Sequence, residues 1–189
     1  MKILEEKILK EAKVLPGGIV KVDSFLNQQL DIALFDELGK EWYSLFKNEG
    51  VTKILTIEAS GIALAAMTAR HFLTPVVYAK KSRSPYGDKD HYHTRVISYT
   101  HGGQYSVTVA KEFISPDDKV LIIDDFLANG SALRALIDIC SQAGATVVGA
   151  GIAVEKAYNG GADKIRADGY RVESLSKIVS AEEGSIAFG

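Results

Sequence analysis

The sequence predicts an α/β domain in which helices flank a central, mainly parallel sheet. Short apolar runs that read as strands alternate with longer segments in which apolar residues recur every three or four positions, as in amphipathic helices. One run, Val120 to Ile123, is continuously apolar, which is typical of a central strand covered on both faces. Alternation of this kind favours a parallel sheet.

Length and composition fit one domain spanning residues 1–189. Hydrophobic residues make up 47% of the chain and charged residues 24%, enough for an ordinary core. The net charge of −2 gives no positive field for nucleic acid. The N-terminus is charged and no apolar run is long enough to cross a membrane, so we expect no signal peptide, no membrane contact and a cytoplasmic protein. Cys140 cannot form an intrachain disulfide, and we expect it to be buried.

The N-terminal elements are helical. Leu4 and Ile8 indicate a short amphipathic helix that ends before Pro16-Gly17-Gly18. A second helix runs from about Asp31 to Lys47. Its apolar stripe consists of Leu34, Leu38, Trp42, Leu45 and Phe46.

The middle of the chain alternates between strands and helices. The predicted strands are 54–57, 76–79, 95–100, 105–110, 120–123 and 147–154, and the predicted helices run to Phe72 and over 131–143. The strands 95–100 and 105–110 form a hairpin through Gly102-Gly103. Ser82 to Thr94 is polar and turn-rich, which predicts a mobile loop.

The segment VLIIDDFLANGSA, Val120 to Ala132, carries the strongest functional signal. Asp124 and Asp125 end an apolar strand, and small residues then open a helix. Free N–H groups and the helix dipole attract a phosphate there, and a glycine lets the backbone approach it closely. The expected phosphate-binding residues are Ala128, Asn129, Gly130, Ser131 and Ala132.

Two carboxylates beside a phosphate would repel it unless they bind sugar hydroxyls or a shared metal ion. Spacing alone also fits an ordinary strand end with an aspartate cap and a glycine turn. No G-x-x-x-x-G-K-[ST] sequence occurs, which excludes a P-loop, and Gly149-Ala150-Gly151 supplies only half of a G-x-G-x-x-G, which disfavours a Rossmann site.

The segment from Val120 to Ala132 resembles the phosphoribosyl pyrophosphate (PRPP) motif of the type I phosphoribosyltransferases. In both, two acidic residues follow an apolar strand, and a loop of small residues follows them, ending here in Gly-Ser-Ala. Longer segments, in order over nearly the whole chain, are similar to the xanthine-using members of that family: KVDSFLNQQLD from Lys21, TIEASG from Thr56, DDFLANG from Asp124 and GIAVEKAY from Gly151. The resemblance implies the type I fold, with a flexible loop and a small hood. Ser82 to Thr94 has no firm match.

The resemblance implies roles for the acids and the loops. Asp124 and Asp125 would be the catalytic pair that holds the ribose hydroxyls, and loop 128–132 would hold the 5-phosphate. The turn that would face the pyrophosphate consists of Glu58, Ala59, Ser60 and Gly61. Lys81, or its neighbour Lys80, would neutralise pyrophosphate charge. A plain connecting turn and a solvated lysine pair are the alternative interpretations.

The xanthine-binding residues that the resemblance implies are Val20, Asn27 and Lys156, and Phe126 is a further candidate to pack against the base. Lys156 can donate to the C6 oxygen and N7 edge of the base, Asn27 can bind the other edge, and the two apolar residues can cover the ring. Without the resemblance, Lys156 would be read as a surface lysine paired with Glu155 or another nearby acid, and Asn27 as a helix cap or turn residue.

The implied reaction converts xanthine and PRPP to xanthosine 5'-monophosphate and pyrophosphate in purine salvage, with Mg²⁺ held mainly by PRPP and with no direct protein ligand. The resemblance also implies a homodimer. His91 and His93 lie in the predicted loop, which could be a lid; a metal site there lacks a third ligand. Two alternatives stay open: a hypoxanthine or guanine phosphoribosyltransferase, and a non-catalytic PRPP-sensing regulator, which the acidic net charge disfavours.

Overall fold

The computed structural model describes residues 1–82, 89–98 and 103–189. Its main sheet has eight strands: β3 (Lys53–Ile57), β4 (Val76–Ser82), β5 (His91–Ser98), β6 (Gly103–Ala110), β7 (Lys119–Leu127), β8 (Thr146–Lys156), β9 (Val172–Glu182) and β10 (Ser185–Phe188). Their order across the sheet is β10-β9-β8-β7-β3-β4-β6-β5. The five inner strands from β9 to β4 are parallel, and the outer three pair antiparallel. This confirms the predicted mainly parallel sheet.

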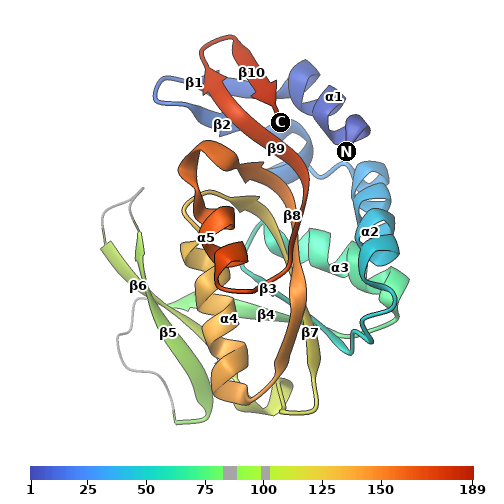
Figure 1. Ribbon diagram of the computed structural model, residues 1–189, viewed down its shortest axis with the longest axis vertical. Coiled ribbons are helices and arrows are strands. Elements are labelled where there is room, and N and C mark those ends of the chain that lie inside the picture. The colour runs from blue at the N-terminus through green and yellow to red at the C-terminus, as the bar shows by residue number, and fades with distance from the viewer. Residues whose placement is uncertain (83–88, 99–102) are drawn as a thin grey trace.

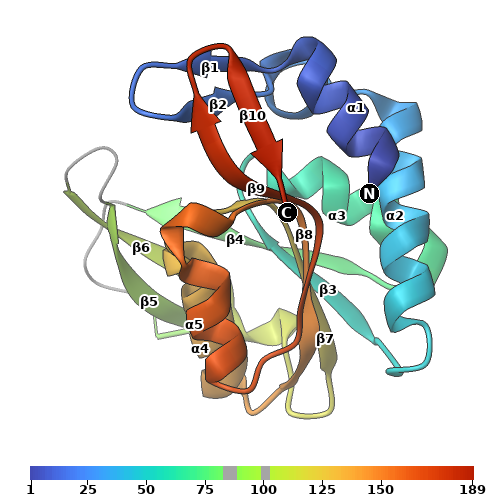
Figure 2. The same ribbon diagram turned by 45° about the horizontal axis from the view of Figure 1, so that its top comes forward.

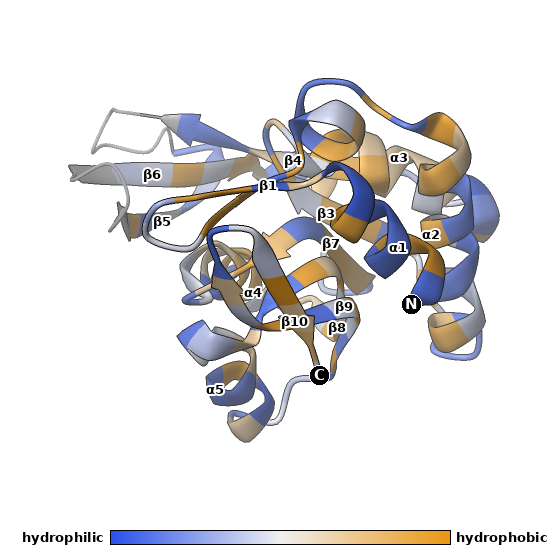
Figure 3. Ribbon diagram, turned by 90° about the horizontal axis from the view of Figure 1, so that it is seen from above, coloured by the Kyte–Doolittle hydropathy of each residue, from blue (hydrophilic) through white to orange (hydrophobic). Residues whose placement is uncertain are grey.

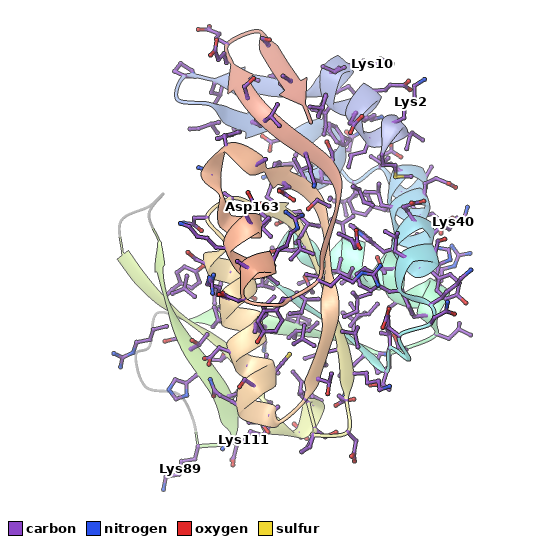
Figure 4. The ribbon with its side chains drawn as sticks, in the orientation of Figure 1. Lys2, Lys10, Lys40, Lys89, Lys111 and Asp163 are labelled. Atoms are coloured by element: carbon purple, nitrogen blue, oxygen red, sulfur yellow. The ribbon has the colours of Figure 1, made fainter. Side chains whose placement is uncertain are left out.

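Helices cover both faces of the sheet (Figures 1 and 2). On one face lie α1 (Lys2–Glu11), α2 (Ile32–Phe46) and α3 (Gly61–Phe72), and on the other lie α4 (Ser131–Ala143) and α5 (Gly161–Ala167). Hydrophobic residues gather on the strands between these two layers (Figure 3). Charged side chains such as Lys2, Lys10 and Lys40 point outward from α1 and α2 (Figure 4). The chain therefore buries one core on each side of a shared sheet.

Four of the five residues in the predicted stripe of α2 are buried, and the fifth, Leu45, is partly buried. Leu34, Leu38, Trp42 and Phe46 are at most 4% exposed. The side chain of Asp31 accepts a hydrogen bond from the Leu34 N–H (3.1 Å), which caps the start of the helix.

The span of α4 matches the predicted helix 131–143, and Cys140 is buried in it as expected. Burial raises the pKa of the Cys140 thiol to about 12, so it behaves as a small hydrophobic side chain.

A small hood lies above one end of the sheet (Figures 1 and 2). It contains the hairpin of β1 (Lys13–Leu15) and β2 (Ile19–Lys21), the π-helix η1 (Asp23–Asn27), and the hairpin of β9 and β10. The β1–β2 hairpin turns at Pro16–Gly18, where the sequence predicted only the end of a helix. Two 3₁₀ turns, η2 (Lys111–Phe113) and η3 (Ala157–Asn159), complete the described elements.

The structure corrects the prediction of a loop over Ser82 to Thr94. Residues 91–94 belong to β5, which pairs with β6 from His91 to Ser98. Only one face of this edge strand packs against the core, so polar residues occupy its other face. The segment therefore lacks the apolar run by which the other strands were predicted. Residues 83–88 and 99–102 lie outside the described part of the chain, so the lid prediction stays a prediction.

A second correction concerns β7, which continues through the two acidic residues to Leu127 instead of ending at them. Among the helices that the structure describes, none is long and apolar enough to cross a membrane.

Candidate active site

The two acidic residues of the predicted phosphate motif are almost fully buried in β7. Asp124 is 5% exposed and Asp125 is 8% exposed. The N–H of Asp125 donates to a carboxylate oxygen of Asp124 (3.0 Å). Burial and then the charge of Asp125 raise the pKa of Asp124 well above its ordinary value. Two carboxyl groups with so little water around them need polar partners, and sugar hydroxyls are suitable ones.

The start of α3 lies directly against this pair. A Cβ atom on Gly61 would lie 2.1 Å from the hydroxyl oxygen of Thr56 and 3.0 Å from a carboxylate oxygen of Asp124. Glycine therefore allows the helix to begin beside the acid pair, where its free N–H groups add partial positive charge.

The rest of the predicted pyrophosphate turn connects to β4. The carboxylate of Glu58 accepts a hydrogen bond from the backbone N–H of Lys81 (2.5 Å), and the N–H of Glu58 donates to Ala79 (3.1 Å). Ala59 is exposed and Ser60 is half-buried. The turn thus brings exposed backbone next to Lys81.

The two neighbouring lysines of β4 face opposite sides of the sheet. The Lys81 ammonium lies 5.9 Å from the ring centre of Tyr105, and its charge lowers the pKa of Asp124 against the larger effects that raise it. Lys80 instead lines a pocket of about 340 Å³ between β4 and β6. Lys81 is therefore the lysine on the side of the acid pair.

Tyr105, in β6, is a site residue that the sequence analysis missed. Burial and the charge of Asp124 raise the pKa of its hydroxyl, which stays protonated and able to donate a hydrogen bond. Its only signal in the sequence is its place in the alternation of β6, which says that it faces the core but not that the hairpin folds toward β7.

The predicted phosphate loop connects β7 to α4. Gly130 has φ 85°, in the left-handed region that favours glycine. The Asn129 side-chain oxygen accepts a hydrogen bond from the Ser131 N–H (3.0 Å), and the Gly130 carbonyl accepts one from Arg134 (2.9 Å). The N–H of Ala132 has no acceptor among the described residues. The loop therefore presents free donors at a helix start, as anion binding requires.

Lys156 lies at the end of β8, on the strand next to the acid pair. Its ammonium is 5.3 Å from the ring centre of Phe126, and burial lowers its pKa. No described residue forms a hydrogen bond or ion pair with it. Glu155 points to the other face and pairs with Arg166 (2.7 Å), so the interpretation of Lys156 as a partner of Glu155 is wrong.

Comparison with known proteins matches this geometry to one family. The model of the phosphoribosyl transferase domain matches residues 21–188. The chain belongs to the phosphoribosyltransferase family. It is 51% identical to the xanthine phosphoribosyltransferase of Bifidobacterium adolescentis over all of this chain and 99% of that protein. It is 47% identical to the enzyme of the same name from Ruminiclostridium cellulolyticum, with the same coverage.

Solved structures confirm the fold of this phosphoribosyltransferase. The APRTase of Giardia lamblia, complexed with 9-deazaadenine, superposes with a TM-score of 0.77 at 24% identity, over 92% of this chain and 97% of that chain. The adenine phosphoribosyltransferase of Rhodothermus marinus gives a TM-score of 0.74 at 23% identity, over 94% and 100%. The predicted type I fold is therefore confirmed.

The hood of this phosphoribosyltransferase carries Val20 and Asn27. Val20 is 6% exposed and its side chain belongs to the core beneath the hood, so it presents little surface to a base. Asn27 is exposed, and it is not the cap of α2, since Asp31 fills that place. The hydroxyl of Tyr158 donates to the Gly18 carbonyl (3.2 Å), which joins the hood to the chain that follows Lys156.

The described part of the phosphoribosyltransferase holds no group of three or more His, Cys, Asp or Glu residues placed to bind a metal ion. His93 instead bonds through its backbone to Gln142 of α4 (2.9 Å). The donor set near the loop is the Asp124–Asp125 pair, which suits Mg²⁺ that keeps its waters and binds mainly to substrate phosphates.

The Glu155–Arg166 ion pair anchors the end of β8 in this phosphoribosyltransferase. Glu155 is 2% exposed, and it accepts hydrogen bonds from both Arg166 and Ser174 (2.5 Å). Burial would raise the pKa of Glu155, but these bonds outweigh it and leave the pKa below its ordinary value.

Arg166→Ala should lower the free energy of unfolding by about 3 kcal/mol at pH 7, because it leaves a buried carboxylate without its cation. Because the pKa of Glu155 is lowered in the folded state, its ionised form stabilises the fold at pH values above the ordinary glutamate pKa. That stabilisation is lost as the pH falls through the lowered pKa, so the difference in stability between the variant and the wild type should shrink in acid. Urea denaturation at pH 7 and pH 4 measures both. Arg70→Ala is the control, since its pair with Asp36 is exposed; an equal loss there would contradict the assignment.

Proposed function

We propose that the protein transfers the 5-phosphoribosyl group of PRPP to xanthine, releasing pyrophosphate and forming xanthosine 5'-monophosphate. The observation that carries the proposal is the half-buried Lys156, which has no hydrogen-bond or ion-pair partner among the described residues and lies one strand from the acid pair. Its relatives of about 50% identity over the full chain carry the name xanthine phosphoribosyltransferase.

The PRPP subsite consists of the phosphate loop, the acid pair and the α3 turn. Residues 128–132 receive the 5-phosphate, because a left-handed glycine and a helix start expose backbone donors there. Asp124 and Asp125 accept hydrogen bonds from the ribose hydroxyls. The turn at Glu58–Gly61 lies against Asp124 and is hydrogen-bonded to Lys81, and together they receive the pyrophosphate.

The base subsite centres on Lys156 and Phe126. A charged lysine only donates hydrogen bonds, so it matches the C6 oxygen of xanthine and not the C6 amine of adenine. Phe126 lies beneath the ammonium and can also pack against the base. Asn27 completes the other edge from the hood. Val20 supports the hood from within the core.

The reaction breaks the bond from ribose C1 to pyrophosphate and forms a bond from C1 to a purine ring nitrogen, through an oxocarbenium-like transition state. The acid pair orients the ribose and stabilises its developing positive charge, and Lys81 favours departure of the anionic leaving group. Mg²⁺ bound to PRPP would add further charge on the pyrophosphate. Xanthine loses a proton readily, so the mechanism needs no dedicated strong base.

The proposal includes a cytoplasmic homodimer that acts in purine salvage. Nothing in the charge of the chain favours nucleic acid as a partner, so the enzyme interpretation is preferred over a PRPP-sensing regulator.

A PRPP-dependent assay against xanthine, guanine, hypoxanthine and adenine tests the function. We expect xanthine to give the highest kcat/KM and adenine to be inactive. A preference for hypoxanthine or guanine would support the related 6-oxopurine enzyme instead, and PRPP binding without turnover of any base would support the regulator.

Lys156→Ala should lower kcat/KM for xanthine about ten- to a hundredfold, the loss expected for one charge-assisted hydrogen bond of roughly 1.5–3 kcal/mol. PRPP binding should change little, because the phosphate loop and the acid pair are on other segments. Steady-state kinetics measure both. Lys164→Ala, an exposed lysine of α5, is the control. A wild-type kcat/KM for xanthine in Lys156→Ala would show that Lys156 does not bind the base.

A further inference from the structure

The first turn of α5 lies directly behind the phosphate loop. Figures 1 and 2 show α5 beside the upper part of α4, where the loop ends. The N–H of Gly161 donates to the carbonyl of Ala128 (3.2 Å). Gly161 is buried and Ile165, one turn later, is 1% exposed. Two residues of one helical face are therefore buried at this contact.

Gly161 has no room for a side chain. A Cβ atom there would lie 2.2 Å from the carbonyl oxygen of Ala128, 2.5 Å from the carbonyl carbon of Asn129 and 2.6 Å from the nitrogen of Gly130. All three are backbone atoms of the phosphate loop, so no side-chain rotation can relieve the contact. The helix and the loop thus meet backbone to backbone.

The turn itself does not require glycine at this position. Gly160, just before it, has φ +65° and supplies the left-handed residue that starts α5, with open space around its Cβ position. Gly161 has no such positive φ. Its lack of a side chain is explained by the contact with the loop alone.

Ile165 supplies a second contact. Its Cδ1 lies 3.0 Å from the place of a Cβ on Gly130. The conformation of Gly130 is therefore limited both by its own φ and by α5. Since the loop is only three residues long between β7 and α4, a shift of α5 toward it must move the backbone donors.

We propose that Gly161 is a positioning residue: it lets α5 support the backbone of residues 128–130 and thereby fixes the loop in the conformation that receives a sugar 5-phosphate. The inference rests on the proposed function, because it takes this loop as the phosphate site. It predicts that Gly161 acts on phosphate binding and not on the base.

The test is binding of ribose 5-phosphate by calorimetry, together with KM for PRPP and for xanthine. Gly161→Ala should weaken ribose 5-phosphate binding and raise KM for PRPP by about ten- to a hundredfold, the effect of misplacing a binding group by about 1 Å. KM for xanthine should stay near its wild-type value. Gly160→Ala is the matched control, since it adds backbone strain at the neighbouring residue without a clash with the loop.

Ile165→Val makes the test independent of whether Gly161→Ala folds, because it removes only the Cδ1 methyl group, which lies beside the Cβ position of Gly130. It should weaken ribose 5-phosphate binding about two- to tenfold, while Ile139→Val, the same deletion elsewhere in the same core, should not. Wild-type binding in a folded Gly161→Ala, or equal effects of the two isoleucine variants, would overturn the inference. Wild-type protein that binds no ribose 5-phosphate would instead refute the proposed phosphate site, and the inference with it.

Discussion

Replacing Asp124 and Asp125 together by Asn should lower kcat/KM for PRPP by about a hundredfold or more, the scale expected when a preorganised charged group at the reacting centre is lost. The exchange keeps the size of both side chains but removes the negative charge that holds the ribose hydroxyls and the developing cation. Steady-state kinetics with xanthine and PRPP measure the loss. Asp117→Asn, at an exposed turn, is the control and should keep wild-type activity.

The same double variant should be more stable than the wild type at pH 7. The raised pKa of Asp124 means that, in the pH range between the ordinary aspartate value and the folded-state value, the folded state keeps a proton that the unfolded state has lost. Stability therefore falls as pH rises from the ordinary aspartate value through the folded-state value, and the amide removes this penalty. Urea denaturation at pH 4 and pH 7 should show the gain growing with pH. A less stable, fully active variant would mean that the pair is structural.

Gly130→Val should abolish measurable binding of PRPP while the fold persists. The left-handed φ of 85° costs a residue with a side chain about 1–2 kcal/mol. The added atoms also meet Ile165 and the backbone of Gly161 (3.0 and 3.4 Å), so the loop must move. Calorimetry with PRPP measures binding, and circular dichroism reports the fold.

Gly169→Val separates the effect of backbone strain from the effect of the contacts with Ile165 and Gly161. Gly169 has φ +91° but nothing within 4 Å of its Cβ position, so it carries the backbone strain without the contact. We expect reduced stability and normal PRPP binding in this control. Normal binding in a folded Gly130→Val would remove the loop from the phosphate site.

The prediction was most reliable where local pattern and burial agree. The stripe of α2, the span of α4 and the apolar run of β7 follow from residue spacing, because a helix or strand must bury its apolar face wherever it lies. The position of the loop between β7 and α4 was predicted for a related reason: a strand, a glycine and a helix start that follow one another in sequence also follow one another in space.

The prediction failed where the local sequence is polar or short. His91 to Thr94 was assigned to a loop because an edge strand of the hairpin exposes one face to solvent. The hairpin around Pro16–Gly18 was missed because its strands have three residues each, and their pairing depends on the hood. The sequence also could not decide between Lys80 and Lys81, since that choice depends on which face of β4 lies on the side of Asp124.

The sequence by itself determined the class of fold. It also located the loop 128–132 and the acid pair that we propose to bind PRPP, since both lie in one run of consecutive residues. Only the tertiary structure decided that Lys156 has no acidic partner among the described residues and that Tyr105 and Lys81 lie on the side of Asp124. It also showed that Gly161, far along the chain, meets the backbone of residues 128–130. These relations join segments that are distant in the chain. They are fixed by the order of strands in the sheet and by the packing of α5, neither of which leaves a local pattern.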